Sequence, residues 1–230
     1  MADSIKIYKS ELEAICRQVS QKQFYDVEVG GDLYGLWTDD GTPIVFLATG
    51  PGPQATFSEL KFHQDHQEIM RCEEYLFYKY GIQYLGDWHS HHILNLDYPS
   101  SGDIKRIQNI LRQPNRNKMV EFIVTHEYTR ASKNERIRGY YYEERKSPVL
   151  IPIEKLDVET SLVRENLLSN NLKMNLMEKY QIDNYSESQS SNQNECLIEE
   201  QKSEDVINSE LMHYGSFFDG VIEKVKKHLL

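Results

Sequence analysis

The chain has 230 residues and a formal net charge of −10 at pH 7. This length is enough for one well-buried core with chain left over, and the acidic balance argues against nucleic acid or an anionic membrane as the main partner. The sequence has no apolar run of about 18 residues and no signal-peptide apolar region. Its three cysteines are scattered without paired spacing, so we expect a cytoplasmic protein with no cysteine metal site.

The first part of the chain alternates between helical and strand patterns. The predicted elements are, in order, a helix over 11–19, strands over 28–37 and 44–48, and a long helix over 57–80. A turn at Asp39-Asp40-Gly41 joins the two strands, and Gly81 is the expected C-cap of the long helix. Strands and helices thus follow one another from the start of the chain.

The same alternation continues to about residue 153. The predicted elements are a strand over 82–88, a helix over 101–112, a strand over 118–124, and a hairpin formed by 136–142 and 149–153. This interleaving, with a hairpin near each end, is typical of an α/β (mixed α+β) fold in which helices flank a mixed sheet.

The residue pattern and the composition of the sequence change after Pro152. Strand character is lost and a helical pattern covers 153–180, followed by a Ser/Gln/Asn-rich segment at 184–194 that is typical of a flexible linker. Two further short helices are predicted over 197–211 and 217–230. We therefore predict one domain over residues 1–155 and a helical C-terminal extension over 156–230, which either packs on that domain or serves as a docking arm for a partner protein.

The most informative stretch is Gly86-Asp87-Trp88-His89-Ser90-His91, followed by Pro99-Ser100-Ser101-Gly102-Asp103. His89 and His91 follow a predicted strand two positions apart, so their side chains lie on one face. A loop then brings Asp103 to the start of a predicted helix. Two imidazoles and a carboxylate are ligand types that hold a catalytic zinc, whose fourth position is left to water. The spacing predicts a zinc (Zn2+) site formed by His89, His91 and Asp103.

Each part of this pattern also has a structural interpretation. Ser100-x-x-Asp103 before an apolar-periodic segment is a variant of the capping box, with Ser100 as the N-cap. The two roles are compatible, because a fixed helix start also fixes the aspartate. A His-x-His pair alone is more often a pair of ordinary polar residues, and the three ligand types in one window favour the metal.

These residues resemble the JAMM motif of the JAB/MPN metallopeptidase family, which consists of a glutamate, a distant His-Ser/Thr-His and then Ser-x-x-Asp. Glu28-Val29-Gly30-Gly31-Asp32-Leu33-Tyr34-Gly35 is similar to the segment that carries the family's glutamate. The match spans roughly 28–103. Two details depart from the family: eight residues separate His91 from Ser100 where seven are usual, and His92 replaces a common proline.

The resemblance implies a JAB/MPN-like fold for residues 1–155 and a role for each motif residue. His89, His91 and Asp103 correspond to the zinc ligands, Glu28 to the general acid/base, and Ser100 to the serine that stabilises the oxyanion. Ser100 rather than Ser101 takes this role because of its spacing to Asp103. The pattern is most similar to bacterial members associated with ubiquitin-like conjugation operons.

The implied activity is that of a zinc-dependent isopeptidase or peptidase that cleaves after the C-terminus of a ubiquitin-like protein. The expected partners are a ubiquitin-like protein and its conjugates, with the activating and conjugating enzymes of the same operon as further candidates. Two alternatives stay open. One is a JAB-type enzyme that processes a sulfur-carrier protein, and the other is an inactive MPN scaffold that binds partners without chemistry.

Overall fold

The computed structural model describes residues 2–21, 27–58, 62–91, 96–128, 133–158 and 160–169, with no side-chain description at 126–128, 133–135 and 168–169. The chain divides into two units, Met1–Lys179 and Tyr180–Leu230. All described residues belong to the first unit, so the predicted linker and the two C-terminal helices lie outside them. Across the described ranges, no helix is long and apolar enough to cross a membrane.

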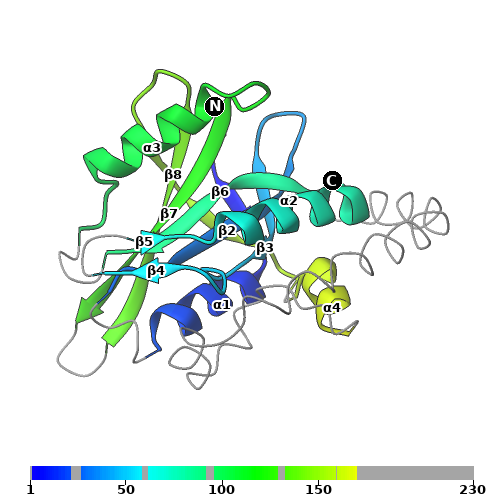
Figure 1. The fold of residues 1–230 in the computed structure, drawn as a ribbon, viewed down its shortest axis with the longest axis horizontal. Coiled ribbons are helices and arrows are strands. Elements are labelled where there is room, and N and C mark those ends of the chain that lie inside the picture. Colours follow the sequence, from blue (N-terminus) through cyan, green and yellow to red (C-terminus); the bar gives the residue numbers. More distant parts are fainter. Residues whose placement is uncertain are drawn as a thin grey trace, which may run out of the picture. The chain divides into compact units, whose positions relative to one another are not determined.

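A mixed sheet of eight strands is the centre of the first unit (Figure 1). The strands lie in the order β10-β1-β3-β2-β6-β7-β8-β9. Their bounds are β1 Ile5–Ile7, β2 Gly30–Trp37, β3 Pro43–Ala48, β6 Gln83–Ser90, β7 Lys118–Tyr128, β8 Lys133–Glu143, β9 Val149–Ile151 and β10 Ile153–Lys155. The pairs β1–β3, β1–β10 and β6–β7 are parallel and the other pairs are antiparallel. This sheet with flanking helices confirms the predicted fold class.

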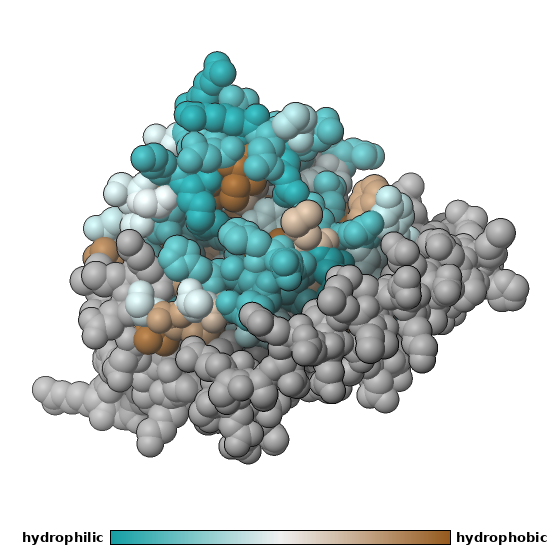
Figure 2. Space-filling view, viewed as in Figure 1, coloured by the Kyte–Doolittle hydropathy of each residue, from teal (hydrophilic) through white to brown (hydrophobic). Residues whose placement is uncertain are grey.

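Helices cover both faces of the sheet. Their bounds are α1 Lys9–Val19, α2 His66–Tyr80, α3 Ser101–Leu111 and α4 Leu162–Ser169. Helix α1 buries Leu12, Ile15 and Val19 in the larger apolar core. Helix α3 buries Ile107 and Leu111 in a second core on the opposite face. The surface drawn in Figure 2 is mainly hydrophilic, with separate small apolar patches, which is in keeping with the charged composition.

The two ends of the sheet approach each other. Strand β9 pairs with β8, and after Pro152 the chain continues as β10, which pairs with β1. The N–H of Ile5 donates to the Pro152 carbonyl at 2.8 Å. A Cβ added at Gly139 in β8 would lie 2.8 Å from the Ile5 side chain and 2.9 Å from that of Ile153. Only a residue without a side chain permits this approach, which lets the curved sheet enclose the larger core.

The register of β6 depends on a bulge at Gly86. Leu33 pairs with Gly86 and Tyr34 with Tyr84, so Leu85 is an extra residue on β6. Gly86 has φ of 151°, and a Cβ there would lie 1.7 Å from the Val120 carbonyl oxygen. Beyond the bulge the register is unbroken to His89. The bulge therefore fixes which residues of β2 face the end of β6.

The helix predicted over 57–80 is wrong in its first third. Strands β4 (Thr56–Phe57) and β5 (Phe62–His63) pair there as a two-stranded sheet, with the rings of Phe57 and Phe62 stacked 5.7 Å apart. The helix begins only at His66, because Asp65 is its N-cap and accepts hydrogen bonds from two backbone N–H groups of the first turn. Its predicted end is confirmed: Gly81 adopts a left-handed conformation with φ of 64°.

The helical pattern predicted over 153–180 is wrong at its start, where Ile153–Lys155 forms β10. A parallel partner, β1, supplies hydrogen bonds that outweigh local propensity. Helix α4 follows, and its Arg164 is 2% exposed. The guanidinium donates to both carboxylate oxygens of Glu11 at 2.8 and 2.7 Å and to the Ala48 carbonyl at 3.0 Å. Helix α4 is thus tied to α1 and β3.

Candidate metal centre

Strand β6 brings two histidines to one face of the sheet. His89 lies in β6 and His91 follows its end, with Ser90 between them. The N–H of Ser90 donates to the Val29 carbonyl at 2.8 Å, and that of His91 donates to the Val124 carbonyl at 2.9 Å. The backbone at this point is held from both sides, by the chain leading into β2 and by β7. Both histidine side chains are buried.

Glu28 lies two residues before β2, and both histidines and Asp103 are near enough to affect its pKa. Gly30 pairs with His89 and the Ser90 N–H donates to the Val29 carbonyl, so the same register continued by one residue sets Glu28 opposite His91. Opposite residues of an antiparallel pair project to the same side. The two strands come close together at Gly30, because a Cβ there would lie 2.5 Å from the Trp88 carbonyl oxygen and 2.9 Å from the Cβ of His89. The β2–β6 register thus unites residues that are far apart in the sequence.

Helix α3 delivers Asp103. Ser100 is its N-cap, and the predicted capping box is confirmed: the Asp103 N–H donates to Ser100 Oγ at 3.2 Å, and the Ser100 N–H donates to Asp103 Oδ2 at 2.8 Å. Because Ser100 Oγ accepts one of these bonds, its own proton remains available as a donor. The helix start therefore fixes a carboxylate and a hydroxyl side by side.

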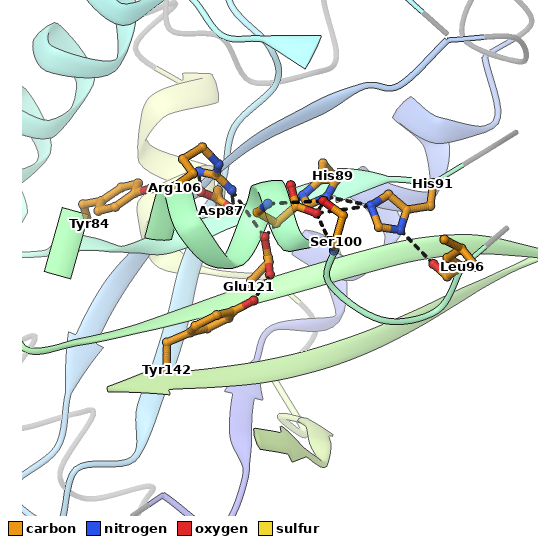
Figure 3. Close-up of polar contacts among 10 residues, drawn as sticks. Tyr84, Asp87, His89, His91, Leu96, Ser100, Arg106, Glu121 and Tyr142 are labelled. Atoms are coloured by element: carbon orange, nitrogen blue, oxygen red, sulfur yellow. Dashed lines mark hydrogen bonds and ion pairs between the residues drawn. The ribbon is translucent and has the colours of Figure 1, made fainter. Parts of the chain in front are cut away.

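The three predicted ligand atoms lie within 4.8 Å of one another, and Figure 3 shows the rings of His89 and His91 pointing toward each other. The Nε2 atoms of His89 and His91 are 3.0 Å apart, and Asp103 Oδ2 is 3.5 and 3.6 Å from them, respectively. Ligand atoms about 2.0–2.1 Å from a tetrahedral zinc are roughly 3.3 Å from one another. The observed separations bracket this value, so the three side chains fit a zinc ion.

The far nitrogen of each histidine has its own partner. His91 Nδ1 lies 2.8 Å from the Leu96 carbonyl oxygen, which only accepts, so Nδ1 carries the proton. His89 Nδ1 lies 3.6 Å from the Glu121 carboxylate. In the neutral rings, both environments favour a proton on Nδ1 and leave the Nε2 lone pairs facing each other. A shared cation satisfies two such lone pairs, and metal-binding histidines usually have this second partner.

The pKa values of His89, Asp103 and Glu28 are shifted by burial and by one another's charges. Burial by itself lowers the pKa of His89, but the hydrogen bond that its ring donates to the Asp103 carboxylate and the charge of Glu121 outweigh it and raise the pKa to about 9. Burial would raise the pKa of Asp103, but both histidines hold it well below its usual range. Burial raises the pKa of Glu28, and the histidines partly oppose that rise. The point between these residues is therefore favourable for a positive charge.

Sequence reasoning missed a second layer of polar residues behind His89. Glu121 on β7 is 0% exposed and lies 3.3 Å from the Arg106 guanidinium, and it accepts a hydrogen bond from the Tyr142 hydroxyl. Arg106 also donates to both carboxylate oxygens of Asp87. The available signals were a glutamate among the apolar residues at the start of the strand Lys118–Tyr128 and an arginine three residues after Asp103.

Asp87, His89 and Glu121 form a second group with metal-ligand atoms close together. The Arg106 guanidinium already bridges the two carboxylates of this group. A second cation there would displace an existing ion pair. The site formed by His89, His91 and Asp103 is therefore the better candidate. His92 lies outside the described residues.

No family model matches the chain. Over 117 residues, it is 28% identical to a protein of Sinorhizobium fredii named as a probable metalloprotease, and the match covers 50% of this chain and 70% of that one. The solution structure of a Desulfitobacterium hafniense protein is similar with a TM-score of 0.50 and 18% identity, over 67% of this chain and 95% of that one. This second similarity concerns the fold alone.

Proposed function

We propose that this chain is a zinc-dependent metallopeptidase of the JAMM type that cleaves after the C-terminus of a ubiquitin-like protein. The observation that carries the proposal is the convergence of His89 Nε2, His91 Nε2 and Asp103 Oδ2 at zinc-ligand separations. The similarity to a protein named as a probable metalloprotease supports the same class of activity.

A zinc ion held by His89, His91 and Asp103 would lower the pKa of a water molecule in its fourth position to about 7. Glu28, opposite His91, is the group that accepts a proton from the attacking water and returns it to the leaving amine. Ser100 donates a hydrogen bond from its hydroxyl group to the oxyanion, while its oxygen stays fixed by the Asp103 N–H.

Charge balance supports a divalent cation in particular. The carboxylates of Asp87, Asp103 and Glu121 lie within 4 Å of His89 or Arg106. Arg106 supplies one positive charge against these three groups. Burial raises the pKa of Glu121 to about 7, and the charge of Asp87 adds to that rise while His89 opposes it. With both histidines neutral, as metal ligands are, a divalent cation would balance the two negative charges that remain.

The substrate class rests on the motif resemblance. Candidate partners are a ubiquitin-like protein, its conjugates, and the activating and conjugating enzymes of the same operon. Gly30 and Gly31 do not add to this argument, because both are buried and a Cβ on either would meet the neighbouring backbone of Trp88 or Thr49.

The metal is tested by analysis of purified protein. We expect about one zinc per chain for the wild type and little for the His89→Ala, His91→Ala double variant, because two of three ligands are lost. Glu28→Gln is the matched variant, since it keeps the size of the side chain and lies outside the ligand set. It should retain zinc. Equal zinc content in wild type and double variant would contradict the site.

The activity is tested on a ubiquitin-like protein fused to a short C-terminal extension, and on an isopeptide-linked conjugate. We expect cleavage of both by the wild type and a loss of about a hundredfold or more in Glu28→Gln. Cleavage of a sulfur-carrier fusion in preference would identify the alternative substrate. Zinc binding with no cleavage of any fusion would favour the scaffold.

A further inference from the structure

A buried carboxylate lies directly behind the first histidine of the candidate centre. Glu121 Oε1 is 3.6 Å from His89 Nδ1, on the side of the ring opposite Asp103. Its other oxygen accepts a hydrogen bond from the Tyr142 hydroxyl, which is also buried. Glu121 belongs to β7 and Tyr142 to β8, so the sheet fixes the position of the carboxylate independently of any ligand. Figure 3 shows this row of side chains.

Arg106 connects this carboxylate to the helix that carries Asp103. It lies one turn after Asp103 on α3, so both side chains leave the same face of the helix. Its guanidinium contacts Glu121 at 3.3 Å and donates to both oxygens of Asp87. Asp87 is on β6, two positions before His89, and pairs in register with Glu121. One guanidinium therefore joins α3 to the two strands beneath it.

We propose that Glu121 and Arg106 form a positioning clamp for the metal centre: Glu121 orients and polarises His89, and Arg106 holds the first turn of α3 so that Asp103 meets both histidines. The clamp rests on the proposed zinc site. Neither residue contacts the ligand-facing atoms, so both act through His89 and Asp103. The sequence motif contains neither residue.

The physical reason for the clamp is twofold. A carboxylate behind Nδ1 keeps the proton on that nitrogen, directs the Nε2 lone pair forwards, and makes it a better donor to a cation. The capping box fixes Asp103 relative to α3 but not relative to the sheet. The planar guanidinium of Arg106 bonds to carboxylates on two strands and so fixes α3 relative to the sheet. A lysine ammonium, which is a single point charge, would fix it less well.

Zinc affinity, measured by competition with a chromophoric chelator, is the test. Glu121→Gln keeps the shape of the side chain and removes its charge. We expect affinity to fall by about ten- to a hundredfold, the usual effect of removing such a partner. Thermal unfolding of zinc-free protein should occur at the same or a higher temperature, because a buried negative charge is lost while Asp87 still pairs with Arg106. A merely structural role would lower both quantities.

The matched control is Asp32→Asn. Asp32 is another buried carboxylate on the same face, it lies opposite Asp87 in the β2–β6 ladder, and its hydrogen bonds come from Gln64 and Tyr34 rather than from the centre. Zinc affinity should be unchanged in this variant. An equal loss in both variants would show a general effect of charge and would overturn the clamp.

Arg106→Lys tests whether the planar guanidinium group is needed, because the substitution keeps the positive charge and removes that group. We expect an intermediate loss of zinc affinity, together with an altered visible absorption spectrum of the cobalt-substituted protein, because Asp103 shifts. If Glu121→Gln fails to fold, Tyr142→Phe tests the same role, since it removes the bond that fixes Glu121 without changing charge. It should weaken zinc binding several-fold at unchanged stoichiometry, and unchanged affinity would overturn the clamp.

The outcomes separate the two proposals. Absence of zinc binding by the wild type would refute the proposed function. Zinc binding by the wild type with an unchanged affinity in Glu121→Gln would refute the clamp alone.

Discussion

Two buried carboxylates, Asp32 and Glu121, lie on the face of the sheet that carries His89 and His91, and they differ in the groups that stabilise them. Asp32 is 3% exposed and accepts hydrogen bonds from Gln64 Nε2 at 2.8 Å and from the Tyr34 hydroxyl at 3.3 Å. Glu121, by contrast, faces a guanidinium and a histidine. Burial and the neighbouring charge of Asp87 raise the pKa of Asp32 to about 7, although both hydrogen bonds oppose the rise. The pKa of Glu121 also rises to about 7, so neither the neutral donors of Asp32 nor the charged partners of Glu121 fully compensate the burial of the carboxylate.

Asp32 should make the stability of the fold depend on pH. The pKa of Asp32 is about 7 in the folded protein and 3.8 in the reference state. Between these values the folded chain holds a proton that the unfolded chain releases, so the free energy of unfolding falls as pH rises from about 4 to about 7. The contribution of this residue is at most about 4 kcal/mol. Asp32→Asn should remove it.

The measurement is denaturant unfolding of wild type and Asp32→Asn at pH 5 and pH 8. We expect the variant to gain stability relative to the wild type on going from pH 5 to pH 8. A difference between the two proteins that does not depend on pH would show that Asp32 is ionised in the fold across this range.

Among the elements of the fold, the N-terminus of helix α3 contributes both to stability and to the candidate site. The first turn of α3 carries Asp103, the cap residue Ser100 precedes it, and Arg106 follows one turn later. Ile107 and Leu111 on the same helix pack into the second core. The apolar face thus sets the height of α3 above the sheet, while its polar first turn faces the end of β6. Stability and chemistry are therefore coupled at Ser100.

Two substitutions separate these roles of Ser100. Ser100→Ala removes the cap and the hydroxyl, so the free energy of unfolding should fall by about 1 kcal/mol and hydrolysis by about a hundredfold or more. Ser100→Gly is a better cap than alanine, so it should cost only a few tenths of a kcal/mol with the same loss of hydrolysis. Denaturant unfolding and cleavage of a fusion substrate are the measurements. Normal turnover in Ser100→Gly would contradict the oxyanion role.

At the scale of the whole first unit, a buried ion pair ties its last described helix to its first. Arg164 and Glu11 are 2% and 0% exposed in their side chains, and 153 residues separate them in the sequence. Glu11 Oε2 also accepts a hydrogen bond from the Ala48 N–H at 2.8 Å. Helix α4 follows the predicted boundary at residue 155, yet it supplies the cation that this carboxylate needs.

Removal of that cation should destabilise the fold. Arg164→Met leaves Glu11 buried without a positive partner, which typically costs about 3–5 kcal/mol. A chain ending after Leu156 should show the same loss or aggregate, whereas one ending after residue 169 keeps α4. Unfolding curves for the three proteins, with zinc content, are the measurements. If the chain ending after Leu156 is as stable as the one ending after residue 169, the pair is dispensable.

The extension beyond residue 169 is tested separately. We expect the chain ending there to bind zinc and to cleave a minimal fusion as the full chain does. Loss of cleavage on a genuine conjugate alone would indicate that residues 170–230 recruit a partner. Full activity on both substrates would show that this segment has no part in recognition.

Features that depend only on neighbouring residues could be predicted from the amino-acid sequence. The capping box of Ser100 and Asp103, the C-cap at Gly81 and the hairpin of β8 and β9 were all predictable, because each is a local pattern of hydrogen bonds or of alternation. The placement of His89 and His91 on one face follows from strand geometry. The mixed sheet with flanking helices followed from the order of such patterns.

The way in which distant segments meet could not be predicted from such local patterns. The bulge at Gly86 sets the register that brings Glu28 opposite His91, and long-range pairing produces β10, where local propensity favoured a helix. Glu121 shows the same limit: a glutamate in an apolar strand gives no sign of its role until Arg106 and His89 are placed beside it. The physical reason is that the energy of a buried charge depends on its partners in space, which a sequence does not state.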